Sequence, residues 1–411
     1  MRPKVKAPGF DAKATRLARV REFLGLKRNI VVLLAALLIV GMGEQLWNGF
    51  TPRYLQELGA GALVIGLYGT LTDLTEAVYP YPGGVLADRL GRKRALVLFT
   101  LLAAAGYIVY LLSPTWLFFL VGVPLAAAWS SMTLPAIFAL IGDNLPKGGR
   151  VIGFGVQSLW KRVPIILAPP LGGWLMERLG LAHGFRLGLV VTIGLALLAL
   201  AIQRRYYVEP EPGVGRSPVP PLRLWREMPL GLKRLLVSDV LTRFGQALYR
   251  VFVVLYAMNV LGAAPVVFGL LSSARMLAAV LPYIPVAKLA DRYGQQPFIT
   301  LTFAFFTLFP LLMVLAPSPA WLLPAFIVAG LREIGEPSRK ALILDLGGET
   351  HRGQAVGLYY LLRGVAIFPG AFLGGLLWQV RPSLPFWAGF VFIAAGLVFF
   401  VGWGPGRKGE R

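Results

Sequence analysis

Long apolar runs alternate with short polar breaks along the whole chain. About 20 consecutive apolar residues are enough to cross the hydrocarbon core of a bilayer as a helix. The pattern predicts an all-α membrane protein with twelve spanning helices. They are expected at residues 30–50, 61–87, 94–112, 116–142, 150–176, 184–203, 232–258, 266–290, 297–316, 319–346, 352–380 and 383–403.

The second six predicted helices repeat the first six in the same orientation. Pro135 corresponds to Pro337 and Arg150 to Arg352, an offset of about 200 residues. Repeated halves of this kind are typical of transporters that hold their substrate at the repeat interface. We therefore divide the chain into an N-terminal tail (1–29), an N-terminal half (30–203), a linker (204–231), a C-terminal half (232–403) and a C-terminal tail (404–411). The run of prolines ending at Pro221 predicts that the linker forms no helix.

Composition agrees with a membrane location. Of the 411 residues, 56% are hydrophobic and only 15% are charged, too few for a soluble protein of this size. The net charge of +22 arises from bases in the polar breaks, where they contact anionic lipids, so nucleic acid is not expected as a partner. The bases gather on the side of the N-terminus, which predicts cytoplasmic termini and an inner-membrane location. A basic tail without a small-residue cleavage site is not a signal peptide.

Catalytic and metal chemistry have little support in the sequence. The chain has no cysteine and two histidines, which excludes disulfides and leaves little for a metal site. No nucleophile with an adjacent base and no phosphate-binding loop is visible, so we do not expect an enzyme. We expect a monomer without a cofactor, driven by a proton gradient.

One short loop between the second and third predicted helices combines charges with glycine. Residues 84–94 read Gly-Val-Leu-Ala-Asp-Arg-Leu-Gly-Arg-Lys-Arg. This loop resembles the G-x-L-A-D-R-x-G-R-K-x signature of the major facilitator superfamily of secondary transporters, and residues 287–294 form a degraded second copy. The resemblance implies the twelve-helix facilitator fold and a cytoplasmic gate at these loops. The gate residues would be Gly84, Asp88, Arg89, Gly91, Arg92, Lys93, Asp291, Arg292 and Gly294.

Charged residues are distributed unevenly among the predicted helices. The third, sixth, ninth and twelfth carry almost none, which predicts that they face lipid, because a charge facing lipid costs about 2.5–3.5 kcal/mol. Acids on the other helices are candidates for binding a coupling proton, since a poorly hydrated carboxyl group favours its protonated form and a nearby arginine opposes this. The candidates are Glu44, Asp73, Glu76, Glu333 and Glu336.

Bases and aromatic residues on the same helices are candidates for lining a substrate cavity. Asp73 and Arg275 occupy equivalent positions in the two halves, so we expect them at comparable depths on opposite cavity walls. An approach of the two in one access state would gate the cycle. The alternative is that such charges only neutralise one another. The cavity candidates are Arg250, Arg275, Arg243, Lys161, Arg332, Arg363, Trp47, Tyr249 and Trp129.

Three functions fit these patterns. We favour export of a small organic or amphipathic compound in exchange for protons. Residues 164–173 resemble the antiporter motif of the fifth helix, keeping Pro169, Gly172 and Gly173 but not its earlier glycines, and small-residue packing explains them equally well. Uptake or exchange of an organic anion is the alternative that the excess of bases favours. A non-transporting membrane sensor or scaffold is the alternative of a different class.

Overall fold

The computed structural model describes residues 28–144, 147–208, 221–346 and 352–405, and the described elements are all helical. Six helical paths form the N-terminal half, and each occupies one of the predicted ranges. Their elements are α2 (Arg28–Trp47) with η1 (Asn48–Phe50) and α3 (Thr51–Glu57), α4 (Ala62–Val78) with α5 (Pro80–Leu90), α6 (Arg92–Leu112), α7 (Trp116–Asn144), α8 (Lys147–Leu179) and α9 (Leu181–Tyr206).

The C-terminal half repeats this arrangement in shorter pieces. Its paths are α11 (Leu230–Arg250) with α12 (Val253–Leu255) and η2 (Tyr256–Val260), α13 (Pro265–Val280) with α14 (Tyr283–Tyr293), α15 (Gln296–Leu315), η3 (Pro319–Trp321) and α16 (Leu322–Leu331) with α17 (Glu336–Leu346), α18 (Arg352–Ile367) with α19 (Gly370–Val380), and α20 (Leu384–Trp403).

Seven stretches of the described helices are long and apolar enough to cross a membrane by themselves. The other paths are broken into shorter helices or carry several charged residues. Both features lower the apolar length of a helix without excluding it from a bilayer when it is covered by its neighbours. The seven stretches are residues 31–57, 92–112, 116–133, 181–206, 296–315, 356–380 and 384–403.

The predicted linker contains a helix, which corrects the sequence-based expectation. α10 (Pro221–Glu227) begins at the last proline of the run and packs against α18. Proline is favourable at the first position of a helix because its missing N–H would have no partner there and its φ angle is already helical. Residues 209–220 of the same segment lie outside the described residues.

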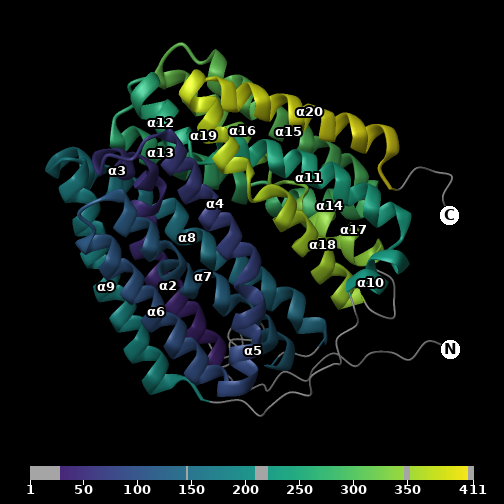
Figure 1. Cartoon of the computed structure of the whole chain (residues 1–411). Coiled ribbons are helices and arrows are strands. Elements are labelled where there is room, and N and C mark those ends of the chain that lie inside the picture. The colour runs from purple at the N-terminus through teal and green to yellow at the C-terminus, as the bar shows by residue number, and fades with distance from the viewer. Residues whose placement is uncertain (1–27, 145–146, 209–220, 347–351, 406–411) are drawn as a thin grey trace, which may run out of the picture.

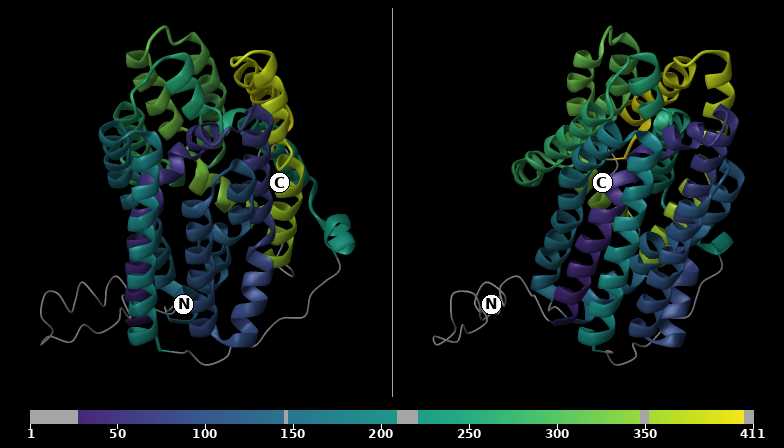
Figure 2. Two further views of the ribbon diagram at one scale, coloured as in Figure 1. Left: turned by 60° about the vertical axis from the view of Figure 1, so that its left-hand side comes forward. Right: turned by 90° about the vertical axis from the view of Figure 1, so that its left-hand side faces the viewer.

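The two halves meet at one end of the molecule and separate toward the other (Figure 1). At the end that we call the closed end, α8 packs against α13 and α4 against α19. Hydrogen bonds between the halves lie there: Asn259 donates to Gln56 at 2.8 Å, and the amide of Phe372 donates to Thr70 at 3.1 Å. At the opposite, open end, α5 lies apart from α17 and α18 (Figure 1). Figure 2 shows the same two halves, purple to teal and green to yellow, from two other sides.

The signature loop and its repeat share one unusual backbone conformation. Gly91 has φ 83° and ψ 152°, and Gly294 has φ 84° and ψ 169°. This region of backbone space is essentially restricted to glycine. Each glycine ends one helix and allows the next helix to begin within two residues, so the loop requires glycine for its shape.

Close backbone contacts join the helices beside the cavity. A Cβ atom added at Gly172 of α8 would lie 1.8 Å from the carbonyl oxygen of Leu46 in α2. One added at Gly173 would lie 2.4 Å from the carbonyl oxygen of Pro265 in α13. The two glycines that the antiporter motif and the packing explanation share therefore allow α8 to touch both halves.

We predict that Gly172→Ala destabilises the protein, because neither backbone can move without separating α2 from α8. Overpacking of this kind costs about 1–3 kcal/mol. The measurement is thermal unfolding of the purified protein in detergent. Gly194→Ala is the matched control, since a Cβ atom there meets nothing within 4 Å. Equal unfolding temperatures for the two variants would contradict the close contact.

Candidate functional site

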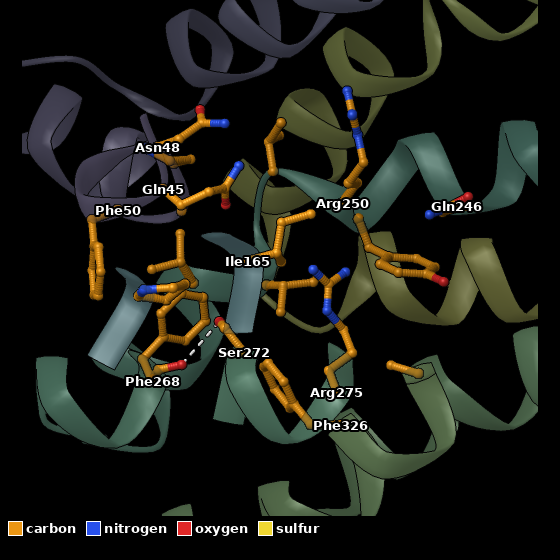
Figure 3. A pocket seen from close by; sticks show the side chains of 18 of the residues that line it. Gln45, Asn48, Phe50, Ile165, Gln246, Arg250, Phe268, Ser272, Arg275 and Phe326 are labelled. Carbon is orange, nitrogen blue, oxygen red and sulfur yellow. Dashed lines mark hydrogen bonds between the residues drawn. The ribbon is translucent and has the colours of Figure 1, made fainter. Parts of the chain in front are cut away.

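A cavity of about 350 Å³ lies between the halves. This volume is within the range of small-molecule sites. Seven of the paths contribute to its wall, and Figure 3 shows how the polar side chains and rings converge on it. The N-terminal half contributes Gln45, Asn48, Gly49, Phe50, Pro52, Tyr68, Thr72, Glu76, Ile165 and Pro169, and the C-terminal half contributes Gln246, Tyr249, Arg250, Val251, Val253, Val254, Phe268, Ser272, Arg275, Phe309, Phe326, Ala329 and Arg332.

An ion pair between the halves borders the cavity. Arg250, at the end of α11, binds Asp73 of α4. In this conformation Asp73 therefore pairs with Arg250 and not with Arg275. Gly69 of α4 packs against Val251, which brings Arg250 to the acid one turn further along α4. Arg275 stands on α13, which packs against α8 instead.

Two arginines of the cavity wall have no carboxylate within ion-pair distance in the described part of the chain. Arg275 lines the cavity from α13, and its guanidinium points toward the middle of the pocket (Figure 3). Arg332 lines it from the break between α16 and α17 and is 9% exposed. Its guanidinium lies 5.0 Å from the ring centre of Phe306 and 5.7 Å from that of Phe309.

The five candidate coupling acids fall into two groups. Asp73, Glu333 and Glu336 bind arginines: Glu333 pairs with Arg162 at 2.9 Å, and Glu336 pairs with Arg243 and, at 2.8 Å, with Arg339. Within the described residues, Glu44 and Glu76 have no such partner. Glu76 is exposed to the cavity, whereas Glu44 lies inside the N-terminal half and accepts a hydrogen bond from Tyr107.

Asp239 is the buried acid that the sequence analysis missed. Its side chain is fully buried in α11 and binds Arg339 at 2.6 Å and Arg363 at 3.2 Å. It also accepts a hydrogen bond of 3.0 Å from Tyr359. The acid joins three paths of the C-terminal half. The available signal was its position four residues before Arg243, which places both on one face of the helix.

Several predicted cavity residues lie elsewhere. Arg363 binds Asp239, Arg243 binds Glu336, and neither lines the cavity. Lys161 is exposed on α8 but outside the cavity wall. These positions correct the expectation that all the bases line one site: α11, α17 and α18 pack together, so their charges face one another.

Two aromatic residues that were predicted to line the cavity, Trp47 and Trp129, are buried elsewhere. Trp47 is 4% exposed and donates a hydrogen bond of 2.9 Å to Thr192 of α9. Trp129 is 2% exposed. Both are core residues of the N-terminal half, where the rings next to Trp47 pack at centroid distances of 5.5–5.9 Å. Tyr249 does line the cavity, as expected.

The neutral polar wall was not predicted. Gln45, Asn48, Gln246 and Ser272 line the cavity beside the charged side chains. Cavity residues were predicted from charge and from aromatic rings, and amide and hydroxyl side chains carry neither. Their occurrence within otherwise apolar spans is a signal that could have found them, since buried amides need hydrogen-bond partners.

The gate residues divide between described and undescribed side chains. Gly84 lies within α5, and Gly91 and Gly294 form the two helix junctions. Arg89 is exposed, and Arg92 and Lys93 begin α6. Arg292 lies over the ring of Tyr293 at 5.4 Å. The side chains of Asp88 and Asp291 lie outside the described residues, so the gate itself stays a prediction.

The pair of Asp73 and Arg250 can be tested by a double-mutant cycle. We expect Asp73→Asn and Arg250→Gln to be coupled by about 1 kcal/mol in thermal unfolding, a modest value because the side chain of Arg250 is 38% exposed to the cavity. The control cycle combines Asp73→Asn with Arg275→Gln and should be additive. If only the cycle of Asp73 with Arg275 showed coupling, the pair of Asp73 with Arg250 would be contradicted.

Removal of the charge of Asp239 should destabilise the C-terminal half strongly. Asp239→Asn leaves Arg339, which is 2% exposed, without its closest counter-charge. Breaking a buried ion pair costs about 3–5 kcal/mol. Asp345→Asn is the control, because Asp345 is exposed on α17 and contacts only Gln295 at 3.2 Å among the described partners. An unfolding temperature for Asp239→Asn equal to that of the control would contradict the structural role of the network.

Known proteins resemble this chain over nearly its full length. The "Uncharacterized MFS-type transporter MJ1317" of Methanocaldococcus jannaschii is 23% identical over 91% of this chain and 94% of its own. The "Quinolone resistance protein NorA" of Staphylococcus aureus is 21% identical over 91% and 96%. The "Multi-drug resistance efflux pump PmrA homolog" of Lactococcus lactis is 28% identical over 71% of this chain and 74% of its own.

The fold is also similar to that of solved transporters. A bacterial homolog of the human lysosomal transporter Spinster, in an inward-facing and unoccupied conformation, superposes with a TM-score of 0.66 at 16% identity, covering 94% of this chain and 96% of that one. The family model of the Major Facilitator Superfamily matches residues 33–240 and again residues 235–411. With two matching halves around a shared cavity, the chain is a multi-pass membrane transporter of the major facilitator superfamily, a family of transporters and not of enzymes.

Proposed function

We propose that this transporter exports a small amphipathic organic compound across the inner membrane in exchange for protons. The observation that carries the proposal is a cavity shared by both halves, in which aromatic rings, amides and unpaired charges face one another. A rocking motion of two halves about such a site exposes it alternately to the two sides of the membrane. The quinolone-resistance and efflux names of two relatives support export.

The lining favours a substrate with an apolar body and polar ends. Phe50, Phe268 and Phe326 provide aromatic ring surface. The ring of Phe50 in the N-terminal half contacts that of Phe268 in the C-terminal half, with 5.4 Å between the ring centroids. Gln45 and Gln246 provide donors and acceptors nearby. Sites of this kind bind the apolar body by burial and orient the ligand with a few polar groups.

Glu76 is the acid that we assign to proton coupling. It is exposed to the cavity and, among described residues, has no ion-pair partner, whereas Asp73 one turn earlier is held by Arg250. A cationic or hydrogen-bond-donating group of the substrate binds the carboxylate, and a proton removes that charge. Because each ligand weakens the other, the transporter releases substrate when it takes up a proton. Glu44 is the second proton site, shielded from the cavity.

Direction follows from the predicted orientation of the chain. The open end holds α5 and the junction at Gly91, and the positive-inside rule assigns the neighbouring bases Arg89, Arg92 and Lys93 to the cytoplasm. The open end is then the cytoplasmic end, where an exporter collects its substrate, and the closed end blocks the outside. This conformation is the loading state of the proposed cycle.

The proposal predicts that Glu76→Gln uncouples transport from the pH gradient. Purified protein in proteoliposomes should lose gradient-driven accumulation of a compound found by thermal-shift screening, because no proton can compete at residue 76. Exchange of that compound without a gradient should survive. Proton flux is followed with a pH-sensitive dye inside the vesicles.

Glu57→Gln is the control for this experiment. Glu57 pairs with Arg53 at 3.0 Å and is 41% exposed, and it does not line the cavity. The control should keep gradient-driven transport at the rate of the unchanged protein. Full gradient-driven transport by Glu76→Gln would remove Glu76 from the coupling mechanism, and Glu44→Gln would then be the variant to examine.

A further inference from the structure

We propose that Arg275 and Arg332 form a subsite for the carboxylate of the transported compound, which makes the substrate an amphipathic organic acid or ampholyte. This inference rests on the proposed transport function, because it assigns a substrate class to the same cavity. It is carried by the contrast between these two arginines and the other arginines of the helices around the cavity.

Five other described arginines lie on these helices at the depth of the cavity or in the network around Asp239, and each has a carboxylate partner, which some of them share. Those partners lie within 4 Å, and the closest fully buried pair is that of Arg339 with Asp239. Arg275 and Arg332 have none in the described part of the chain, although Arg332 is only 9% exposed. The paired arginines are Arg162, Arg243, Arg250, Arg339 and Arg363.

The acid next to Arg332 in the chain is already bound by another base. Glu333 directly follows Arg332 in the chain. Its carboxylate is bound at 2.9 Å by Arg162 of the opposite half. The two guanidinium groups are therefore left with hydrogen-bond donors beside the cavity that no carboxylate of the described residues accepts.

The backbones that carry the two arginines are in direct contact. A Cβ atom added at Gly330, two residues before Arg332, would lie 2.1 Å from the carbonyl oxygen of Arg275. Both side chains extend from this contact into the same cavity. Each arginine ends in a planar guanidinium group, which can bind the two oxygens of a carboxylate in a bidentate manner. Because the two side chains start from adjacent backbones, both can reach the same carboxylate.

Aromatic rings hold Arg332 in place without neutralising it. Two guanidinium groups lie over the ring of Phe306, that of Arg332 at 5.0 Å and that of Arg243 at 4.8 Å from its centre. Arg243 is fixed in turn by Glu336. Stacking of this kind orients a guanidinium and leaves its N–H groups free for an acceptor. The rings of Phe268 and Phe326 line the same cavity and provide a surface for the apolar body.

A purely structural arginine and a ligand-binding arginine differ in what their removal does to the empty protein. A structural arginine stabilises the fold through its partner, so its loss lowers the unfolding temperature. A buried arginine without a counter-charge is unfavourable until a ligand supplies one. Arg332→Gln should therefore leave the unfolding temperature of the empty transporter unchanged or raise it.

The experiment uses purified full-length protein in detergent at pH 7, without a gradient. Thermal shift and equilibrium binding are measured with benzoate, 2-naphthoate, indole-3-acetate and decanoate, each beside its primary amide. We expect at least one acid to bind more tightly than its amide. Arg275→Gln and Arg332→Gln should each weaken that acid about 10- to 100-fold, the value of one hydrogen-bonded charge pair, and leave the amide unchanged.

Two further variants make the test specific. Arg186→Gln is the matched control, because Arg186 contacts Tyr54 at 3.2 Å away from the cavity wall; it should keep the preference for the acid. Arg332→Lys keeps the positive charge but not the planar guanidinium group, and should bind the acid with intermediate affinity. If a Gln variant fails to fold, the Lys variant at the same position decides the question.

The subsite is wrong if none of the four acids is preferred over its amide, or if a preference survives in both Gln variants. It is also wrong if Arg332→Gln lowers the unfolding temperature of the empty protein as Asp239→Asn does. Failure of the subsite alone would leave proton-coupled transport of a neutral compound in proteoliposomes intact. A confirmed preference for acids without any proton flux would instead overturn the proposed coupling.

Discussion

The need to neutralise charge inside a membrane organises the interior of this protein. A single buried charge is expensive in a poorly hydrated environment, and a pair costs less only when its geometry is good. Asp239 illustrates the requirement, since one fully buried carboxylate holds two arginines and a tyrosine from neighbouring paths. Those contacts fix α11, α17 and α18 relative to one another. The C-terminal half can therefore move as a unit during alternating access.

Contact between the halves depends on glycine residues, which have no side chain and let two helices approach closely. Gly66 and Gly375 allow α4 and α19 to approach until a Cβ atom would lie 2.6–2.7 Å from a backbone oxygen of the partner helix, and Gly173 does the same between α8 and α13. Close approach gives dispersion contacts that need no polar partner. Such contacts can be made and broken as the halves rock, because separating them leaves no buried charge alone.

Features that depend on local chemistry could be predicted from the sequence. Contacts that depend on where a helix breaks could not. The positions of the helical paths and the shared backbone conformation of Gly91 and Gly294 follow from apolar length and from what only glycine can adopt. The partner of Asp73 could not be deduced in this way. It depends on the end of α11 at Arg250 and on the contact of Gly69 with Val251, neither of which has a periodic signal.

The break between α16 and α17 brings these constraints together. Within five residues it directs Arg332 into the cavity, Glu333 to Arg162 of the other half, and Glu336 to the network around Asp239. Gly335 at this break donates its amide hydrogen to Thr302 at 2.8 Å, so the segment is held to α15 although it is not helical. The arginine of the proposed subsite and the acid that binds the opposite half are therefore neighbours in one short irregular segment. This segment is the place where the cavity wall and the contact between the halves meet.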